Sequence, residues 1–132
     1  VARQAASGDV WILSTINWVG IRYYQNLNKT GDKFPSFAFP SEMYFHSSWS
    51  DTVLWSREKE RLEKEADSLV AEVSRLVGKA NRRIWLVAGY HPEVSGIIKN
   101  RLDREFDPVI EIKGGSFSNP FENSIFAYTK KK

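Results

Sequence analysis

The sequence predicts one α/β domain, a three-layer α/β/α sandwich with a mostly parallel sheet. Two matched segments, residues 10–16 and 83–89, are the basis for this prediction. Both are short, nearly all apolar and rich in β-branched and aromatic residues, without the alternation of a half-exposed strand. Such runs are typical of parallel strands that helices cover on both faces. A helix-like stretch follows each run, as a crossover between parallel strands requires.

Composition describes an ordinary globular domain and excludes several classes of protein. The 132 residues are enough for one domain with a core of its own, and we assign residues 1–132 to it. The net charge is only +3, and no basic stripe is interleaved with aromatics, so nucleic acid is not expected as a partner. The absence of cysteine rules out disulfides, thiolate catalysis and cysteine-ligated zinc.

The ends of the chain point to a larger protein. No apolar run approaches the roughly 20 residues that a membrane-spanning helix needs, and no signal peptide is visible. The chain begins at Val1 and its one methionine is Met43. We therefore expect a piece excised from a longer protein. The terminal lysines, Lys130 to Lys132, are either native or an addition.

The first half of the chain is predicted to form a strand, a helix, a strand and a loop. The strand covers 10–16, and apolar residues at near-helical spacing predict a short helix over 19–27. A turn cluster precedes an aromatic strand over 34–40, where proline is tolerated at the start or edge. Residues 41–56 show no regular pattern, and packing against the helices is the alternative to an interaction role. The candidate interaction residues of this loop are Tyr44, Phe45 and Trp49.

The second half contains two amphipathic helices. Ser56 is a plausible N-cap and Gly78 a plausible terminator of the first helix. Its apolar face comprises Leu62, Ala66, Leu69, Val70, Val73, Leu76 and Val77. The second helix begins at Pro92, a residue favoured at the first helical position. Its buried stripe is expected to comprise Val94, Ile97, Ile98, Leu102 and Phe106.

The chain order of these elements predicts the topology of the sheet. A strand over 84–89 separates the two helices, and Asp107-Pro108 is expected to end the second one. Strands over 109–112 and 124–129 complete the domain. Right-handed crossovers then give a flavodoxin- or Rossmann-like sheet of order about 2-1-3-4, with the last strand antiparallel at the edge.

Ligands of such sheets bind beyond the carboxyl ends of the strands, where the strand order reverses. This point lies between the strands at 10–16 and 84–89. An imidazole beside a carboxylate could act as an acid–base pair there, and an aromatic ring could stack on a sugar. The alternative is that the histidine caps the next helix and the aromatics pack against the rim of the sheet. The candidate ligand-binding residues are Thr15, Asn17, Trp18, Tyr90, His91 and Glu93.

The chain lacks the motifs of several catalytic classes. No G-x-G-x-x-G and no Walker lysine follow the first strand, which argues against a dinucleotide or nucleoside triphosphate, and no cofactor is expected. No G-x-S-x-G elbow occurs, and neither Ser14 nor Ser95 has a neighbour that would activate it. The two histidines, His46 and His91, are far apart, so no metal site is expected. No self-sufficient catalytic set is therefore visible.

Five segments along the chain form a pattern of their own. They are Gly8–Leu13, the pair Tyr23-Tyr24, Phe37–Pro40, Asn81–Val87 and Ile125–Tyr128. In order and spacing they resemble the C-terminal soluble domain of polytopic glycosyltransferases that use lipid-phosphate sugars, the protein O-mannosyltransferase and aminoarabinose-transferase relatives. The resemblance extends over most of the chain.

This resemblance implies a non-catalytic domain on the extracytoplasmic face of a membrane, periplasmic or outer. Transmembrane helices of the same polypeptide would precede it and hold the catalytic acidic residue, and the domain would help position a lipid-linked sugar donor or a glycan acceptor. The loop over 41–56 is longer than the family needs. Two alternatives remain: a free-standing soluble flavodoxin-like module that binds a small ligand or a protein, and an enzyme that uses His91 and Glu93.

Overall fold

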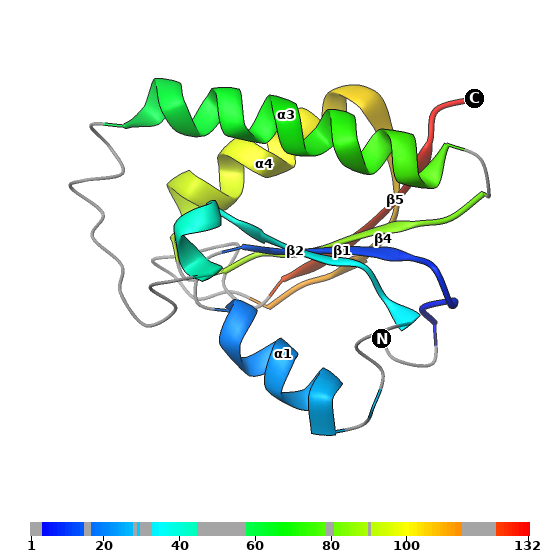
Figure 1. Cartoon of the computed structure of the whole chain (residues 1–132). Coiled ribbons are helices and arrows are strands. Elements are labelled where there is room, and N and C mark those ends of the chain that lie inside the picture. The colour runs from blue at the N-terminus through cyan, green and yellow to red at the C-terminus, as the bar shows by residue number, and fades with distance from the viewer. Residues whose placement is uncertain are drawn as a thin grey trace.

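The computed structural model describes residues 4–14, 17–27, 29, 33–44, 58–78, 81–89, 91–114 and 124–132. Over these residues the chain is an α/β fold with an open five-stranded mixed sheet and three α-helices (Figure 1). The elements are, in chain order, β1 (Val10–Ser14), α1 (Asn17–Leu27), β2 (Ser36–Phe39), the 3-10 helix η2 (Ser41–Tyr44), α3 (Lys59–Val77), β3 (Ile84–Val87), α4 (Pro92–Glu105), β4 (Phe106–Ile112) and β5 (Ile125–Lys130).

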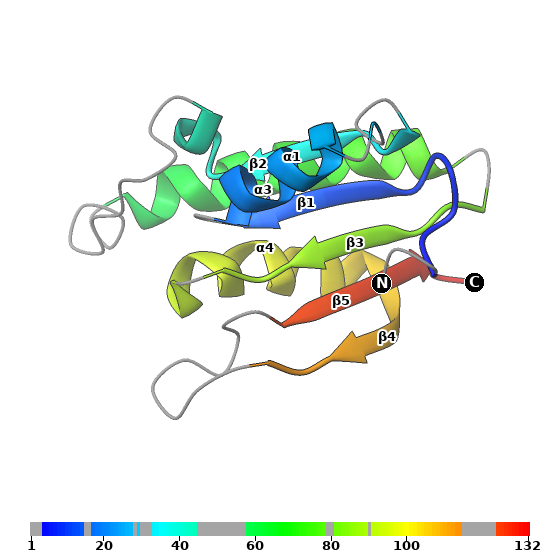
Figure 2. The same ribbon diagram turned by 90° about the horizontal axis from the view of Figure 1, so that it is seen from below.

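The strand order is β2-β1-β3-β5-β4, as Figure 2 shows from below. Strand β1 pairs in parallel with β2 and β3, as predicted, and β5 is antiparallel, as predicted. The predicted edge position of β5 is wrong: it lies between β3 and β4 and is antiparallel to both. The reason is that α4 carries the chain past one strand position, so the last strand fills the gap and β4 becomes the edge. The sheet is therefore mixed: β1, β2, β3 and β4 run in one direction and β5 runs against them.

Helices cover both faces of the sheet. Helices α3 and α4 lie on one face and α1 lies on the other (Figure 1). Strands β1 and β3 are buried at every position, which confirms the reading of the two apolar runs. Because neighbouring side chains of a strand point to opposite faces, Ile12 packs under α3 and α4 while Trp11 packs on the other side.

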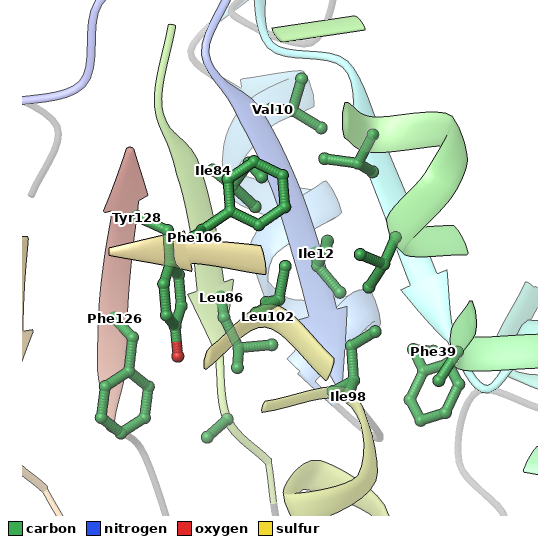
Figure 3. Packing of buried hydrophobic residues seen from close by; sticks show 14 of the residues in the cluster. Val10, Ile12, Phe39, Ile84, Leu86, Ile98, Leu102, Phe106, Phe126 and Tyr128 are labelled. Atoms are coloured by element: carbon green, nitrogen blue, oxygen red, sulfur yellow. The ribbon is translucent and has the colours of Figure 1, made fainter. Parts of the chain in front are cut away.

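The larger core cluster lies between the sheet and the helices α3 and α4. The predicted face of α3 is confirmed, since Leu62, Val73 and its other predicted members are buried or partly buried there. Figure 3 shows the side chains that the strands and α4 contribute, among them Ile12, Leu86, Leu102 and Tyr128. The smaller cluster contains Trp11 and Trp85, whose rings stack with centroids 5.7 Å apart.

The start of α3 and the end of α4 differ from the predictions. Helix α3 begins at Lys59 after Glu58, two residues later than an N-cap at Ser56 would place it, and Ser56 lies outside the described residues. Helix α4 begins at Pro92, as predicted, but it ends at Glu105. Phe106 already has extended dihedrals and starts β4, which continues through Pro108. Proline is tolerated there because β4 is an edge strand.

Helix α1 begins at Asn17, before the predicted start at residue 19. Its buried face is not the one that carries the aromatic residues. Tyr23, Tyr24 and Leu27 are each more than 60% exposed. The side chain of Ile21 packs against the smaller core cluster instead, and that of Gln25 is buried. Gln25 Nε2 donates to Ser36 Oγ of β2 at 3.2 Å, which links the helix to the edge of the sheet.

A buried carboxylate holds the amino ends of β1 and β3 together. Gly8 has a φ of +89°, a conformation that favours glycine, and it directs the chain into β1. Asp9, only 2% exposed, follows it. Asp9 Oδ2 accepts hydrogen bonds from Trp85 Nε1 at 2.8 Å and from the Ala6 amide at 2.9 Å, and Oδ1 accepts one from the Arg83 amide at 3.0 Å.

Candidate functional site

The carboxyl ends of β1 and β3 are adjacent, as the sequence predicts. Leu13 of β1 lies opposite Val87 of β3, and α1 and α4 begin a few residues after these strands. Of the six candidate residues, Thr15 and Tyr90 lie outside the described residues. Asn17 and Trp18 form the start of α1, where the structure describes the backbone alone. His91 and Glu93 flank Pro92 at the start of α4. Their role in binding stays a prediction.

A hydrogen-bonded pair of serines closes this end of the sheet. The hydroxyls of Ser14, the last residue of β1, and Ser95, in the first turns of α4, are 2.7 Å apart. The Gly89 amide donates to Ser95 Oγ at 3.0 Å. Both serines are at most 1% exposed. The pair therefore ties α4 to the ends of β1 and β3 and satisfies polar groups that would otherwise be buried at a cost.

His91 is the N-cap residue of α4, but its side chain makes no capping hydrogen bond. Its backbone carbonyl accepts from the Ser95 amide at 3.0 Å. The residue is 6% exposed, and burial lowers the pKa of the imidazole, an effect that the nearby carboxylate of Glu93 opposes. Desolvation disfavours the charged form of a histidine, so the ring is neutral at neutral pH. The expectation that His91 stands at the helix cap is correct for its backbone position.

The side chain of Glu93 is exposed, in contrast to that of His91. Glu93 lines a hollow of about 530 Å³ between the start of α3 and the first three turns of α4. The other candidate residue with a described side chain, His91, is not part of the lining. The two members of the proposed acid–base pair thus differ in exposure, since His91 is buried and Glu93 lines the hollow, and their pairing stays a prediction.

The described residues at the strand ends include neither an accessible nucleophile nor a group of metal ligands. A nucleophilic serine needs a base within hydrogen-bonding reach and an open approach for the substrate, whereas Ser14 and Ser95 are buried and bonded to each other. Over the described ranges, no group of three or more histidine, aspartate or glutamate side chains is placed to hold a metal ion. The serine pair therefore has a structural role at this end of the sheet.

The interaction loop is described only at its beginning. Its first residues form η2 (Ser41–Tyr44), where the Ser41 amide donates to Glu65 Oε1 of α3 at 2.6 Å. Glu42 forms an ion pair with Arg61 of α3. Tyr44 ends η2, with its backbone alone described, and Phe45 and Trp49 lie outside the described residues. An interaction role for these three aromatic residues remains a prediction.

The sequence held a partial signal for the residues that the prediction missed. Ser95 occurs at helical spacing with Ile98 and Leu102, so it lies on the buried stripe of α4. Ser14 likewise ends a wholly apolar run, which indicates a buried hydroxyl. Neither position alone reveals that the two hydroxyls meet, because that depends on where α4 crosses the sheet.

Comparisons with known proteins add no assignment. Among the described residues, no helix combines the length and the apolar character needed to cross a bilayer. Comparison of the chain with protein-family models, with curated protein sequences and with solved structures finds no significant match.

Proposed function

We propose that this chain is a non-catalytic, extracytoplasmic domain of a membrane glycosyltransferase that uses a lipid-linked sugar donor. In this role it helps position the glycan acceptor or the donor, while the transmembrane part of the same polypeptide carries out the transfer. The proposal rests on the resemblance of five segments to the soluble domain of such enzymes. A non-catalytic role agrees with the hydroxyls of Ser14 and Ser95, which are buried and bonded to each other.

One structural observation supports the proposal above the others. Four of the five resembling segments form four neighbouring strands, because Phe37–Pro40 contributes β2, Gly8–Leu13 contributes β1, Asn81–Val87 contributes β3 and Ile125–Tyr128 contributes β5. Motifs scattered over more than a hundred positions thus belong to one continuous sheet. If this chain and the glycosyltransferase domains share a fold, these four strands are the part that both would retain.

The proposal also includes a three-layer α/β/α architecture. Helix α1 on one face and α3 with α4 on the other support it (Figure 1). The order β2-β1-β3 corresponds to the first three strands of a flavodoxin-like sheet. The antiparallel strand β5 between β3 and β4 is the departure from that pattern.

The first experiment is to read the gene upstream of Val1. We expect several apolar spans of about 20 residues each, long enough to cross a bilayer, and an acidic pair in the first extracytoplasmic loop. A start codon directly before Val1 would overturn the proposal. It would favour the alternative, a free-standing soluble module that binds a small ligand or a protein.

The second experiment measures transfer. The purified 132-residue chain is incubated with a radiolabelled polyprenyl-phosphate sugar and an acceptor glycan, beside membranes that contain the parent protein. We expect transfer by the membranes and none by the isolated chain. Transfer by the isolated chain would refute the non-catalytic assignment.

A further inference from the structure

The hollow between α3 and α4 has the dimensions of a small-molecule site. Its volume of about 530 Å³ lies within the range of roughly 300–1,000 Å³ that is typical of ligand pockets. Buried Leu62 of α3 and Val94 of α4 lie at its base, and the partly buried Ile97 completes an apolar floor. The two helices lie side by side above the sheet (Figure 1), so the walls belong to regular elements that hold their side chains in place.

A glycine in the wall keeps the hollow open. Gly96 lies inside α4, at the fifth of its fourteen positions, where glycine is less favourable than every residue except proline. A Cβ built on Gly96 meets no heavy atom of the described chain within 4 Å, so packing within this domain does not demand a glycine. Its φ is not positive either. A glycine without such an internal reason is expected where another molecule approaches the backbone closely.

The polar groups around the floor match a neutral ligand with many hydroxyl groups. Lys59 and Arg101 are the cations of the lining and Glu63 and Glu93 are its anions, so groups of both signs surround the floor, with Arg101 also paired to Asp67. Asn100 adds an amide that both donates and accepts. A hydroxyl group also does both, so a sugar can bond to the carboxylates, the cations and the amide together. A phosphate would face two carboxylates, and a cationic peptide would face two cations.

One of these groups is already oriented. Arg101 Nε donates to Asp67 Oδ1 of α3 at 2.5 Å, and the side chain of Arg101 is only 16% exposed. This ion pair joins the two helices beside the hollow and fixes the direction of the guanidinium group. A donor whose rotamer is held before binding loses less conformational entropy when the ligand arrives.

We propose that the hollow between α3 and α4 is a binding site for a neutral saccharide, with Gly96 forming the contact surface and Asn100, Glu63 and Arg101 bonding to hydroxyl groups. The choice of a saccharide as the biological ligand rests on the proposed function, in which the domain positions a glycan acceptor. The location of the site rests on the geometry of the hollow alone.

The test is a titration of the ¹⁵N-labelled chain with neutral disaccharides, namely mannobiose, cellobiose and lactose, followed by amide chemical shifts. We expect at least one disaccharide to shift the amides of Ile97 and Asn100 saturably, with a Kd of about 1–10 mM, as for a small exposed site. Gly96→Leu places a side chain in the hollow and should weaken binding at least about tenfold. Leucine is a strong helix former, so this variant is expected to remain folded.

Controls separate the hollow from the rest of the helical surface. Ala71→Leu adds a similar side chain to the exposed face of α3, away from the lining, and should leave the Kd within about twofold. Asn100→Ala removes the amide without filling space and should also weaken binding. It serves as the second test if Gly96→Leu does not fold. No shift of these amides at the highest disaccharide concentration, or equal binding by Gly96→Leu, would overturn the proposal. Shifts produced by inorganic phosphate or by a neutral peptide, but by no disaccharide, would overturn the ligand class.

Failure of this site and failure of the proposed function give different results. Saccharide binding by a chain whose gene encodes no membrane spans would remove the glycosyltransferase assignment and keep the site. Membrane spans upstream of a chain that binds no disaccharide would keep the proposed function and remove the site.

Discussion

Replacement of Asp9 by alanine removes one acceptor group that three donors share. The carboxylate is 2% exposed and bonds to the indole of Trp85 and to the amides of Ala6 and Arg83. These bonds join the turn before β1 to the start of β3, on a part of the sheet where Trp85 itself is fully buried. Loss of the acceptor therefore leaves a buried indole N–H without its partner.

The expected cost follows from the burial of each donor. A buried donor that loses its acceptor costs about 1–3 kcal/mol, and the Trp85 indole belongs to this class. The amides of Ala6 and Arg83 are part-buried, so water can replace the carboxylate at about 0.5–1 kcal/mol each. The sum lowers the free energy of unfolding by about 3 kcal/mol, a large share of the roughly 5–15 kcal/mol of a typical domain.

Urea denaturation, followed by tryptophan fluorescence, measures this change. Trp85→Phe removes the indole donor and keeps an aromatic ring, so a double-mutant cycle with Asp9→Ala should give a coupling energy of about 1–2 kcal/mol. Asp107→Ala, which removes an exposed carboxylate from β4, is the matched control and should change stability by less than about 0.5 kcal/mol. A loss below about 0.5 kcal/mol for Asp9→Ala, or zero coupling, would refute the reasoning.

Three further substitutions test other parts of the structure. Because burial lowers the pKa of His91, the unfolded chain takes up a proton below about pH 6.5 that the folded chain does not, so stability falls as the pH decreases. His91→Gln should therefore lose less stability than the parent chain between about pH 7.5 and pH 5.5 in urea melts, and an equal loss would contradict this. Gly96→Ala should raise the free energy of unfolding by about 0.5–1 kcal/mol, because the new methyl group meets open space, and a decrease in calorimetry would argue against that space. Ser95→Ala removes the partner of Ser14 and of the Gly89 amide and should cost about 1–3 kcal/mol in the same urea assay, whereas a neutral result would show that the serine pair contributes no net stability.

Much of the fold follows from local patterns in the sequence. The apolar runs at 10–16 and 83–89 predicted the two buried central strands, because a strand covered on both faces consists mostly of apolar residues. The apolar spacing from Leu62 to Val77 predicted α3 and its buried face, since one side of a helix repeats every three to four residues. Pro92 marked the start of α4 for a similarly local reason.

The predictions failed where one local pattern fits two structures, or where contacts with distant segments determine which side of an element is buried. Asp107-Pro108 signals the end of a helix, but it does not tell whether the residues around it form a turn or an edge strand, and here they belong to β4. In α1 the aromatic residues marked a helix without marking its buried side. Ile21 and Gln25 occupy that side, because the groove that β1 and β2 offer accepts an aliphatic side chain and an amide bonded to Ser36.

The candidate site shows the same division. The sequence correctly placed the ends of β1 and β3 side by side, since the carboxyl ends of parallel neighbours meet at one edge of a sheet. It also proposed an acid–base pair of His91 and Glu93 at this edge, and that pairing stays a prediction. The side chain of His91 is buried, whereas Glu93 is exposed and lines the hollow between α3 and α4.

The sequence by itself determined the approximate positions of the strands and helices and the buried residues of β1, β3 and α3, because periodicity and apolar content act within a few residues. Only the tertiary structure decided that β5 lies between β3 and β4, that Ser14 meets Ser95 across 81 positions, and that Gly96 faces a hollow. These features depend on the path that α4 takes over the sheet. That path is set by the packing of the whole core, which no short segment encodes.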